Sequence, residues 1–422
     1  MTRPDASFVE VSSPAWSFWR ALLDTCVGAI VGTVFAFVAI LVIGIVGEEA
    51  LSSLYWQVDL DPLFRASMGV ILLVGAVLGL TAPFVMVAER YAALRAVEAS
   101  ARDTPDGVAQ SSLRAELRSA PAAHLQKTGT VMFWCFAGLG GIWALAVFFT
   151  EDLRDDPVNW IALAVFVVLA VAAALVQGLG FRMRERDAAV TGGLGARWTH
   201  AVPRANAADA ERRRAAAPAV VPSWLVTPSA RSIRRVAGVL VTALIVSLGA
   251  FMLSVFMRQQ CRTCDPVYWD EPIENGIDVL SLGSGAAIAL CAALGLIAWI
   301  AGLVLQFSRE IALARWVADG DPRRVDTGLI QPLLTGNRAM VRLQLGLSAL
   351  GAAGIVFGVG AIWADWAAMD TQVVLGAAVA LLALGLLVGW TDAPRSRRER
   401  QRVRDTMFPG DPDVAGTLKA LR

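Results

Sequence analysis

The stretch Gly138-Leu139-Gly140-Gly141-Ile142-Trp143 decides the fold, because Gly358-Val359-Gly360-Ala361-Ile362-Trp363 repeats it 220 residues later. Sliding residues 94–143 over residues 314–363 without a gap gives ten identities in fifty positions. Besides the glycines, isoleucine and tryptophan of the motif, the identities include Arg95/Arg315, Asp106/Asp326 and Arg118/Arg338. We interpret the chain as two copies of one unit.

Three shorter matches lie outside this alignment, in the same order relative to the apolar runs. They are Pro14-Ala15-Trp16 with Pro222-Ser223-Trp224, Tyr55-Trp56 with Tyr268-Trp269, and Arg184-Glu185-Arg186 with Arg398-Glu399-Arg400. The alternative is that Gly- and Ala-rich membrane helices align through composition alone. Internal repeats in membrane transport folds are often this faint, so the shared order favours duplication.

The composition places the chain in a lipid bilayer. Hydrophobic residues make up 56% of the 422 residues and charged residues 17%, whereas a soluble domain has about 25% charged residues. Nearly all basic residues are arginine, with Lys127 and Lys419 as the exceptions, and alanine is abundant. This usage resembles proteins of high-GC bacteria, so we expect a bacterial plasma membrane protein. No nucleic-acid partner is expected.

Eight apolar runs are each close to the roughly 20 residues that span a bilayer core. Because lipid offers no hydrogen-bond partner to the backbone, and because the alternation of barrel strands is absent, these runs must be helices. The sequence therefore predicts an all-α polytopic membrane protein with eight transmembrane helices, near residues 21–46, 67–87, 128–149, 161–181, 236–257, 279–307, 343–362 and 373–390.

The positions of the basic residues predict the orientation. Loops after the first, third, fifth and seventh spans hold four of the 37 Lys and Arg residues, which are Arg65, Arg154, Arg258 and Arg262. Because basic residues favour the cytoplasmic side, both termini are predicted to be cytoplasmic. Tryptophans are expected to mark both interfaces, the outer one by Trp56, Trp160, Trp269, Trp363 and Trp366 and the inner one by Trp16, Trp19, Trp224, Trp316 and Trp390.

Four spans in each copy is an even number, so both copies enter the membrane in the same direction. The prediction is two parallel four-helix repeats related by an axis along the membrane normal. The expected units are a first repeat at 1–186, a flexible cytoplasmic Ala/Arg/Pro-rich linker at 187–221, a second repeat at 222–394 and a basic cytoplasmic tail at 395–422.

Asp24 is the one acidic residue well inside an apolar run. An intramembrane carboxylate is a functional candidate because burying its charge is costly. Arg20, however, lies four residues earlier on the same helix face, about one turn from the cytoplasmic interface. We therefore favour a structural pair of Asp24 with Arg20, and keep a coupling or binding role as the alternative.

Cys261-Arg262-Thr263-Cys264 lies in a predicted outer loop and has no counterpart in the first copy. Oxidising conditions outside the cell favour a disulfide between Cys261 and Cys264. A metal site would need further ligands, and His124 and His200 are both predicted on the cytoplasmic side. Metal binding, thiol exchange and free thiols remain the alternatives.

Small residues recur at four-residue spacing, which lets helix backbones approach closely in lipid. The pairs are Gly28/Gly32, Gly75/Gly79, Gly354/Gly358 and Gly385/Gly389. The alternative is that the segments containing Gly138 and Gly140, and Gly358 and Gly360, are broken helices around a central site next to Trp143 and Trp363. No proline interrupts either segment, so we favour packing.

Each copy carries a charged connection between its second and third spans, starting at residues 89–95 and 309–315. These stretches are expected to continue the helices beyond the membrane. Arg95 and Arg315, with Arg118 and Arg338 further along, are expected to anchor to anionic lipid headgroups. A docking site for a cytoplasmic protein partner is the alternative.

Three classes of function remain. The architecture favours a transporter or permease-like subunit, and the scarcity of ionisable residues in the spans favours an apolar or lipid-like ligand over a charged one. The alternative is a non-catalytic scaffold or subunit of a larger membrane complex. An enzyme is not expected, because no GxxxxGK[ST], HExxH or GxSxG motif and no acid–base cluster is present, and no cofactor is expected.

The orientation yields a labelling prediction. In intact cells, a membrane-impermeant thiol reagent is expected to modify the variants Asp156→Cys and Ala367→Cys but not Ala210→Cys, after subtraction of the labelling of the unaltered chain. The reason is that the basic-residue distribution puts position 210 inside the cell. Labelling of position 210 from outside would refute this topology.

Overall fold

The computed structural model describes residues 7–9, 11–42, 61–104, 107–109, 113–114, 117, 120–150, 154, 157–215, 217–218, 229–258, 269–318, 323–324, 339–365 and 368–407. In this part of the chain, eight helices are long and apolar enough to cross a membrane. They are α1 (Pro14–Val42), α3 (Asp61–Asp103), α5 (Pro121–Phe149), α7 (Pro157–Ala215), α8 (Ser229–Arg258), α9 (Glu271–Ala318), α11 (Ala339–Trp363) and α12 (Ala368–Met407). The prediction of a helical multi-pass membrane protein is confirmed.

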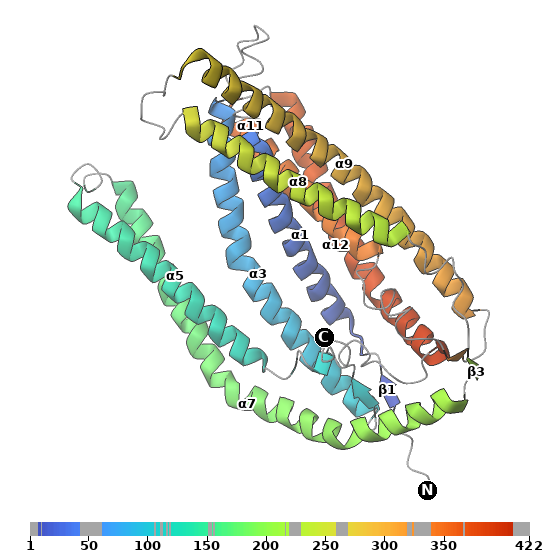
Figure 1. Cartoon of the computed structure of the whole chain (residues 1–422). Helices are drawn as coiled ribbons and strands as arrows, with labels where there is room; N and C mark the ends of the chain where they lie inside the picture. The colour runs from blue at the N-terminus through green and yellow to red at the C-terminus, as the bar shows by residue number, and fades with distance from the viewer. Residues whose placement is uncertain are drawn as a thin grey trace.

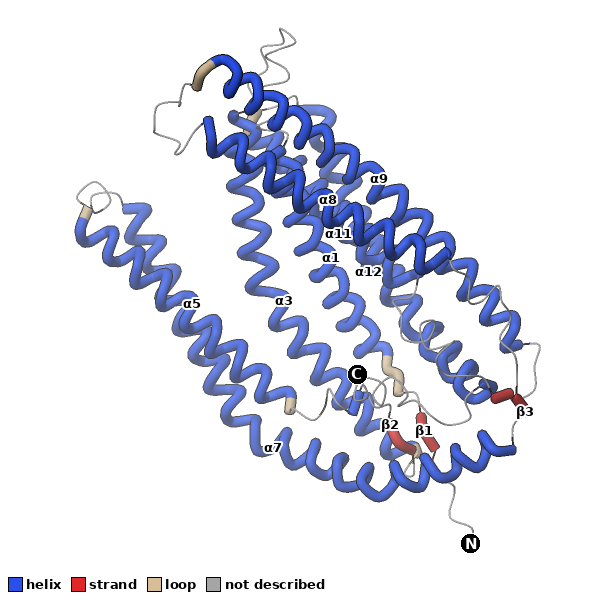
Figure 2. Tube along the Cα trace, in the orientation of Figure 1, coloured by secondary structure: helices blue, strands red, loops and turns tan. Residues whose placement is uncertain are grey.

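Two short parallel strand pairs lie at one end of the helices (Figure 2). Strand β1 (Ser7–Val9) pairs with β2 (Gly107–Ala109), and β3 (Ala217–Pro218) pairs with β4 (Arg323–Arg324). Each pair joins the segment before one helix hairpin to the segment after it, around α1–α3 and around α8–α9. We call this end of the molecule, where α1 begins and α3, α7, α9 and α12 end, the strand end.

The sequence Ser13-Pro14 favours a helix start, and α1 begins there. Pro14 occupies the first turn, where its missing N–H has no cost, and the Ser13 hydroxyl accepts a hydrogen bond from the Trp16 backbone N–H at 3.1 Å. The helix then runs without a break to Val42.

The core is a bundle of α1, α3, α11 and α12, in which α1 is the central helix (Figure 1). One face of α1 is buried along its whole length, because small or apolar residues recur at three- and four-residue spacing from Ala21 to Ile40. Toward the end opposite the strands, Ala36 and Ile40 pack with Val70 of α3 and Val356 of α11.

The contact between α1 and α11 is close enough to involve backbone atoms. A Cβ atom added at Gly28 would lie 2.7 Å from the Ser348 Cβ and 2.9 Å from the Leu345 carbonyl oxygen. A Cβ atom added at Gly32 would overlap the backbone of Ala349. The glycine pair of α1 therefore serves helix packing, as the four-residue spacing predicts.

Two hairpins flank this core, α5–α7 and α8–α9. In Figure 1 the α5–α7 hairpin lies close to α3 at the strand end and diverges from it toward the other end. Its two helices touch at three glycines. Gly129 lies against the α7 backbone, Gly180 against the α5 backbone and Gly140 against the Phe166 side chain. Helix α8 packs mainly on α9, and most of its large apolar side chains, including Val239 and Ile245, are exposed.

Helices α3 and α9 continue past their apolar runs, as expected for residues 89–95 and 309–315. The α3 extension packs into a small core at the strand end with the start of the chain and with α7. That core contains Val11, Ala93, Leu94, Ala96, Val97, Ala109, Leu113, Leu117 and Leu194.

The interval expected to be a flexible linker, 187–221, is helical as far as Ala215, because α7 continues through it. Alanine, arginine and glutamate are strong helix formers, and Leu194 and Ala201 are buried against the strand-end segments. The expected tail is likewise helical from 395 to Met407 in α12.

The packing predicts different effects on stability for two glycine-to-alanine substitutions. Gly32→Ala is expected to lower the free energy of unfolding by about 1–3 kcal/mol, because the added methyl group overlaps α11 backbone. Gly75→Ala is the matched control, since nothing lies within 4 Å of its added Cβ, and it should be neutral or slightly stabilising. Equilibrium denaturation in mixed SDS micelles measures both, and equal losses would contradict the α1–α11 contact.

Candidate functional site

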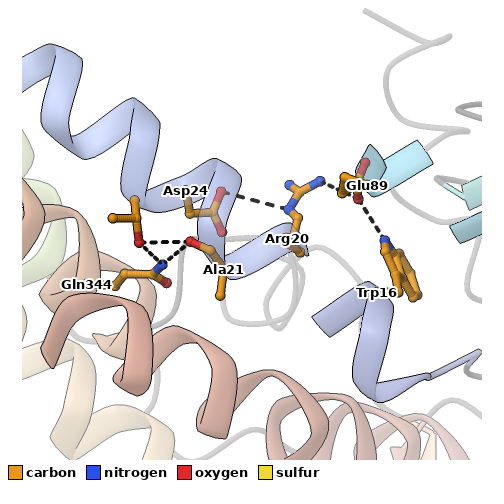
Figure 3. A network of polar contacts seen from close by, with 7 residues as sticks. Trp16, Arg20, Ala21, Asp24, Glu89 and Gln344 are labelled. Carbon is orange, nitrogen blue, oxygen red and sulfur yellow. Dashed lines mark hydrogen bonds and ion pairs between the residues drawn. The ribbon is translucent and has the colours of Figure 1, made fainter. Parts of the chain in front are cut away.

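A network of polar side chains joins α1 to α3 at the strand end (Figure 3). The Trp16 indole Nε1–H donates to Glu89 Oε1 at 2.7 Å. The Arg20 guanidinium lies between two carboxylates, with Nη1 3.6 Å from Glu89 Oε1 and Nε 3.8 Å from Asp24 Oδ1. The pair of Arg20 with Asp24 that the helical spacing predicts is therefore part of a larger group.

Burial differs sharply within this network. Glu89 is only 3% exposed, whereas the Arg20 side chain is 46% exposed and that of Asp24 24% exposed. A buried carboxylate is costly unless hydrogen bonds and an opposite charge compensate it, and Trp16 and Arg20 supply these. The half-exposed Arg20–Asp24 pair contributes little to stability by itself. Glu89 is thus the residue around which the network is built.

Gln344 of α11 continues the polar contacts on the other side of α1. Its amide Nε2 donates to the Ala21 carbonyl oxygen at 2.6 Å and to Thr25 Oγ1 at 3.1 Å. The side chain is 1% exposed and rests on Gly389 of α12, where a Cβ atom would overlap it. The first turns of α1 are therefore held by Glu89 on one side and by Gln344 on the other.

Two further carboxylates each accept a hydrogen bond from the first turn of a helix. Asp187 of α7, which is buried, accepts from the Tyr91 hydroxyl at 2.7 Å and from the Ala122 N–H of α5 at 3.1 Å. Glu310 of α9 accepts from the Ala339 N–H of α11 at 2.9 Å and from Gln306 Nε2 at 3.0 Å. Both satisfy a backbone donor at the positive end of a helix dipole.

The residues of the two motif copies do not line one common site. Gly138 has no atom within 4 Å of an added Cβ and Gly140 faces Phe166, whereas Gly358 faces Leu375 and Gly360 meets Ser67 of α3. The Trp143 indole donates to the Asn159 carbonyl oxygen at 3.3 Å, while the Trp363 ring lies beside Gly69 of α3. Matching residues thus have different neighbours in the two halves.

The remaining predicted residues are placed only in part. Arg95 and Arg315 are exposed near the strand end, in the helix extensions where headgroup anchors are expected. Arg118 and Arg338 lie outside the described residues, as do Cys261 and Cys264, whose disulfide stays a prediction. Of the cysteines within spans, Cys26 is buried, Cys291 is half-buried and Cys135 is exposed on α5.

Sequence reasoning missed Glu89, Gln344 and Asp187 as site residues. Glu89 stands just after an apolar run, in a stretch interpreted as a solvated surface, so its burial had no local signal. Gln344 did carry a signal, because it is a polar amide near the start of the apolar run 343–362. Buried polar side chains in membrane helices usually bond across helices, as Gln344 does.

The polar contacts of the strand end run between helices. Within the ranges that the structure covers, no group of three or more His, Cys, Asp or Glu side chains could hold a metal ion. The polar network instead fixes three helices relative to one another. Comparison with protein-family models, with curated proteins and with solved structures finds no match to this chain.

The network predicts graded losses of stability at Glu89. Glu89→Ala is expected to cost about 1–3 kcal/mol, because the partly buried Trp16 indole N–H loses its Glu89 acceptor. Glu89→Gln should cost less, since an amide oxygen still accepts that bond while the charge opposite the half-exposed Arg20 is lost.

Glu185→Ala on the exposed face of α7 is the matched control, with no loss expected. The free energy of unfolding in mixed micelles is the measurement. A loss for Glu89→Ala no larger than that of the control would show that the network does not hold α1.

Proposed function

We propose that this chain is a non-catalytic integral membrane subunit that acts as a scaffold in a larger membrane complex. The observation that carries the proposal is the contact of α1 with α11, which belong to different predicted halves. Gly28 and Gly32 bring α1 onto the backbone of residues 345–349, so small residues fill this seam instead of lining a space for a ligand.

The flanking hairpins supply the surfaces that a scaffold needs. Helix α8 exposes Val239 and Ile245, at 68% and 64%, and α5 exposes Trp134 and Ile142, at 69% and 68%. In a bilayer such faces contact lipid or other transmembrane helices. Glycines without neighbours on the same helices, Gly138 on α5 and Gly249 on α8, would let a partner helix approach closely.

A permease-like role for an apolar or lipid-like ligand is the second candidate. The divergence of the α5–α7 hairpin from α3 supports it (Figure 1), together with the exposed side chains of Leu72 and Leu73 on α3, at 70% and 52%. A ligand arriving from within the bilayer would meet these apolar surfaces without passing a charged side chain.

Both candidates share an architecture of two parallel four-helix repeats. The two strand pairs support it, because β1–β2 and β3–β4 occupy the same place around α1–α3 and α8–α9. The hairpins α5–α7 and α11–α12 add a second parallel, since glycines hold the two helices of each hairpin close together, Gly180 against the Gln126 backbone and Gly389 against the Gln344 side chain.

The location and orientation belong to the same proposal. The protein would reside in a bacterial plasma membrane with the strand end in the cytoplasm, because the basic residues gather in the segments that meet there. The outer loop after α8 would then carry the disulfide between Cys261 and Cys264.

Site-specific photocrosslinking in native membranes tests the scaffold against the permease. A photoreactive residue at Ile245 or at Val239, both exposed on α8, is expected to yield discrete protein adducts with a partner other than this chain. The same residue at Ala352, which is 2% exposed in the core, is the control and should yield none.

Purified full-length chain in liposomes completes the test, with a fluorescent phospholipid whose movement between leaflets is followed by dithionite quenching. A scaffold should leave the rate of empty liposomes unchanged. Protein-dependent lipid movement without partner adducts would reject the scaffold and favour the permease.

A further inference from the structure

Three helices converge on the Asp187 carboxylate at the strand end, and this convergence brings basic side chains together. Tyr91 of α3 and Ala122 of α5 both donate to Asp187 Oδ2. Arg90 precedes Tyr91 on α3, and His124 and Lys127 lie two and five residues after Ala122 on α5. The shared Asp187 contact therefore brings the basic residues of the two helices to the same end.

On α5, Lys127 stands at the head of an exposed apolar stripe. Side chains at spacings of three and four residues share one helix face, and from Lys127 this face continues through Val131, Trp134 and Gly138. Lys127 is exposed, Val131 is 54% exposed and Trp134 is 69% exposed, and nothing lies within 4 Å of a Cβ added at Gly138.

On α3, the helix face of Arg90 is half-buried at Met86 and Pro83 and becomes exposed from Gly79 onward, in the same direction away from the strand end. This exposed stripe includes Gly79, Gly75 and Leu72, of which Leu72 is 70% exposed and the two glycines have open space around them. Gly79 and Gly138 each lie eleven residues from the basic residue of their helix. That is about 16 Å of helix, close to half of a bilayer core of about 30 Å.

We propose that an anionic phospholipid binds between α3 and α5 in the leaflet of the strand end, with its phosphate at Arg90, His124 and Lys127 and its acyl chains along the two stripes. Charge complementarity selects the headgroup, because basic pockets between transmembrane helices attract anionic lipids. The exposed apolar side chains that follow the basic residues on both helices favour a lipid over a soluble anion, because acyl chains can lie along them. The site uses the α5 face of Trp134 and Gly138, so the bound lipid and a partner helix would exclude one another on that face, whereas the α8 face stays open to a partner.

Asp187 contributes a negative charge beside this cluster. Its Oδ2 already accepts two hydrogen bonds from Tyr91 and Ala122, and the residue is 5% exposed. Lys127, by contrast, is exposed on α5 and accessible from the leaflet. Asp187 therefore fixes the three helices, while Lys127 is the group with the freest approach to a headgroup.

Native mass spectrometry of the purified full-length chain, titrated with phosphatidylglycerol or phosphatidylcholine of the same acyl length, tests the site. Phosphatidylglycerol is expected to bind more tightly, and Lys127→Gln should weaken it about fivefold. Arg90→Gln together with Lys127→Gln should weaken it about 25-fold. Lys127→Arg should keep wild-type affinity, and Arg315→Gln, an exposed arginine at the same end of α9, is the control with no change.

Two further experiments distinguish binding of a phospholipid headgroup from binding of a soluble phosphate. Glycerol 3-phosphate and inorganic phosphate are not expected to displace the lipid at equal concentration, because they lack acyl chains. Gly138→Leu, which fills the open position on the α5 stripe, should weaken phosphatidylglycerol binding, whereas Gly249→Leu on α8 should not.

Equal binding of the two lipids would overturn the proposal, as would displacement by inorganic phosphate or an unchanged affinity in the properly folded Lys127→Gln variant. The exposed Lys127 makes this variant the least disturbing to the fold. Unchanged thermal unfolding of each variant separates lost lipid binding from lost structure.

Discussion

The whole arrangement depends on how closely α1 can approach α11. In lipid, no hydrophobic driving force holds two apolar helices together, so association relies on packing and on hydrogen bonds between helices. Gly28 and Gly32 allow backbone contact with residues 345–349, and Gln344 adds two hydrogen bonds from α11 to the start of α1. The other core helices are placed by this pair, α3 through Glu89 and α12 through the contact of Gly389 with Gln344.

Polar contacts concentrate at the strand end for a physical reason. A carboxylate deep in the bilayer would bear the full cost of losing water, whereas one near an interface can be met by an arginine that reaches solvent. Glu89 with Arg20 follows this rule, while Asp187 and Glu310 accept hydrogen bonds from the first turns of α5 and α11 at the same end. The strand end thus joins the helices through directed bonds, while the opposite end of the bundle core relies on apolar packing such as Ala36 and Ile40 on Val70 and Val356.

How much the sequence predicts depends on whether the signal is local. Length and hydropathy predict all eight helices, and Ser13-Pro14 predicts where α1 begins, because these signals lie within the segment concerned. Contacts between residues that are far apart in the sequence leave no such local signal. The burial of Glu89 arises from Trp16, 73 residues away. The flexible linker expected at 187–221 is an α7 extension as far as Ala215, stabilised partly by Leu194 in the strand-end core. The spacing of Arg20 and Asp24 predicts their contact, but the third member of that group, Glu89, lies on another helix.

Each half gives one helix hairpin to the core and leaves one at the periphery. Helices α1 and α3 precede the linker, α11 and α12 follow it, and together they make the core, while α5–α7 and α8–α9 remain at the periphery. In each peripheral hairpin, the two helices pack one face against each other and leave their other faces to the membrane. Exposed apolar faces such as that of Ile245 meet lipid or a neighbouring transmembrane helix, and the proposed scaffold would use them for its partners. The α3 and α5 surfaces also face the bilayer, and each has a basic residue at its strand end. Such a surface preferentially binds lipids that have an anionic headgroup.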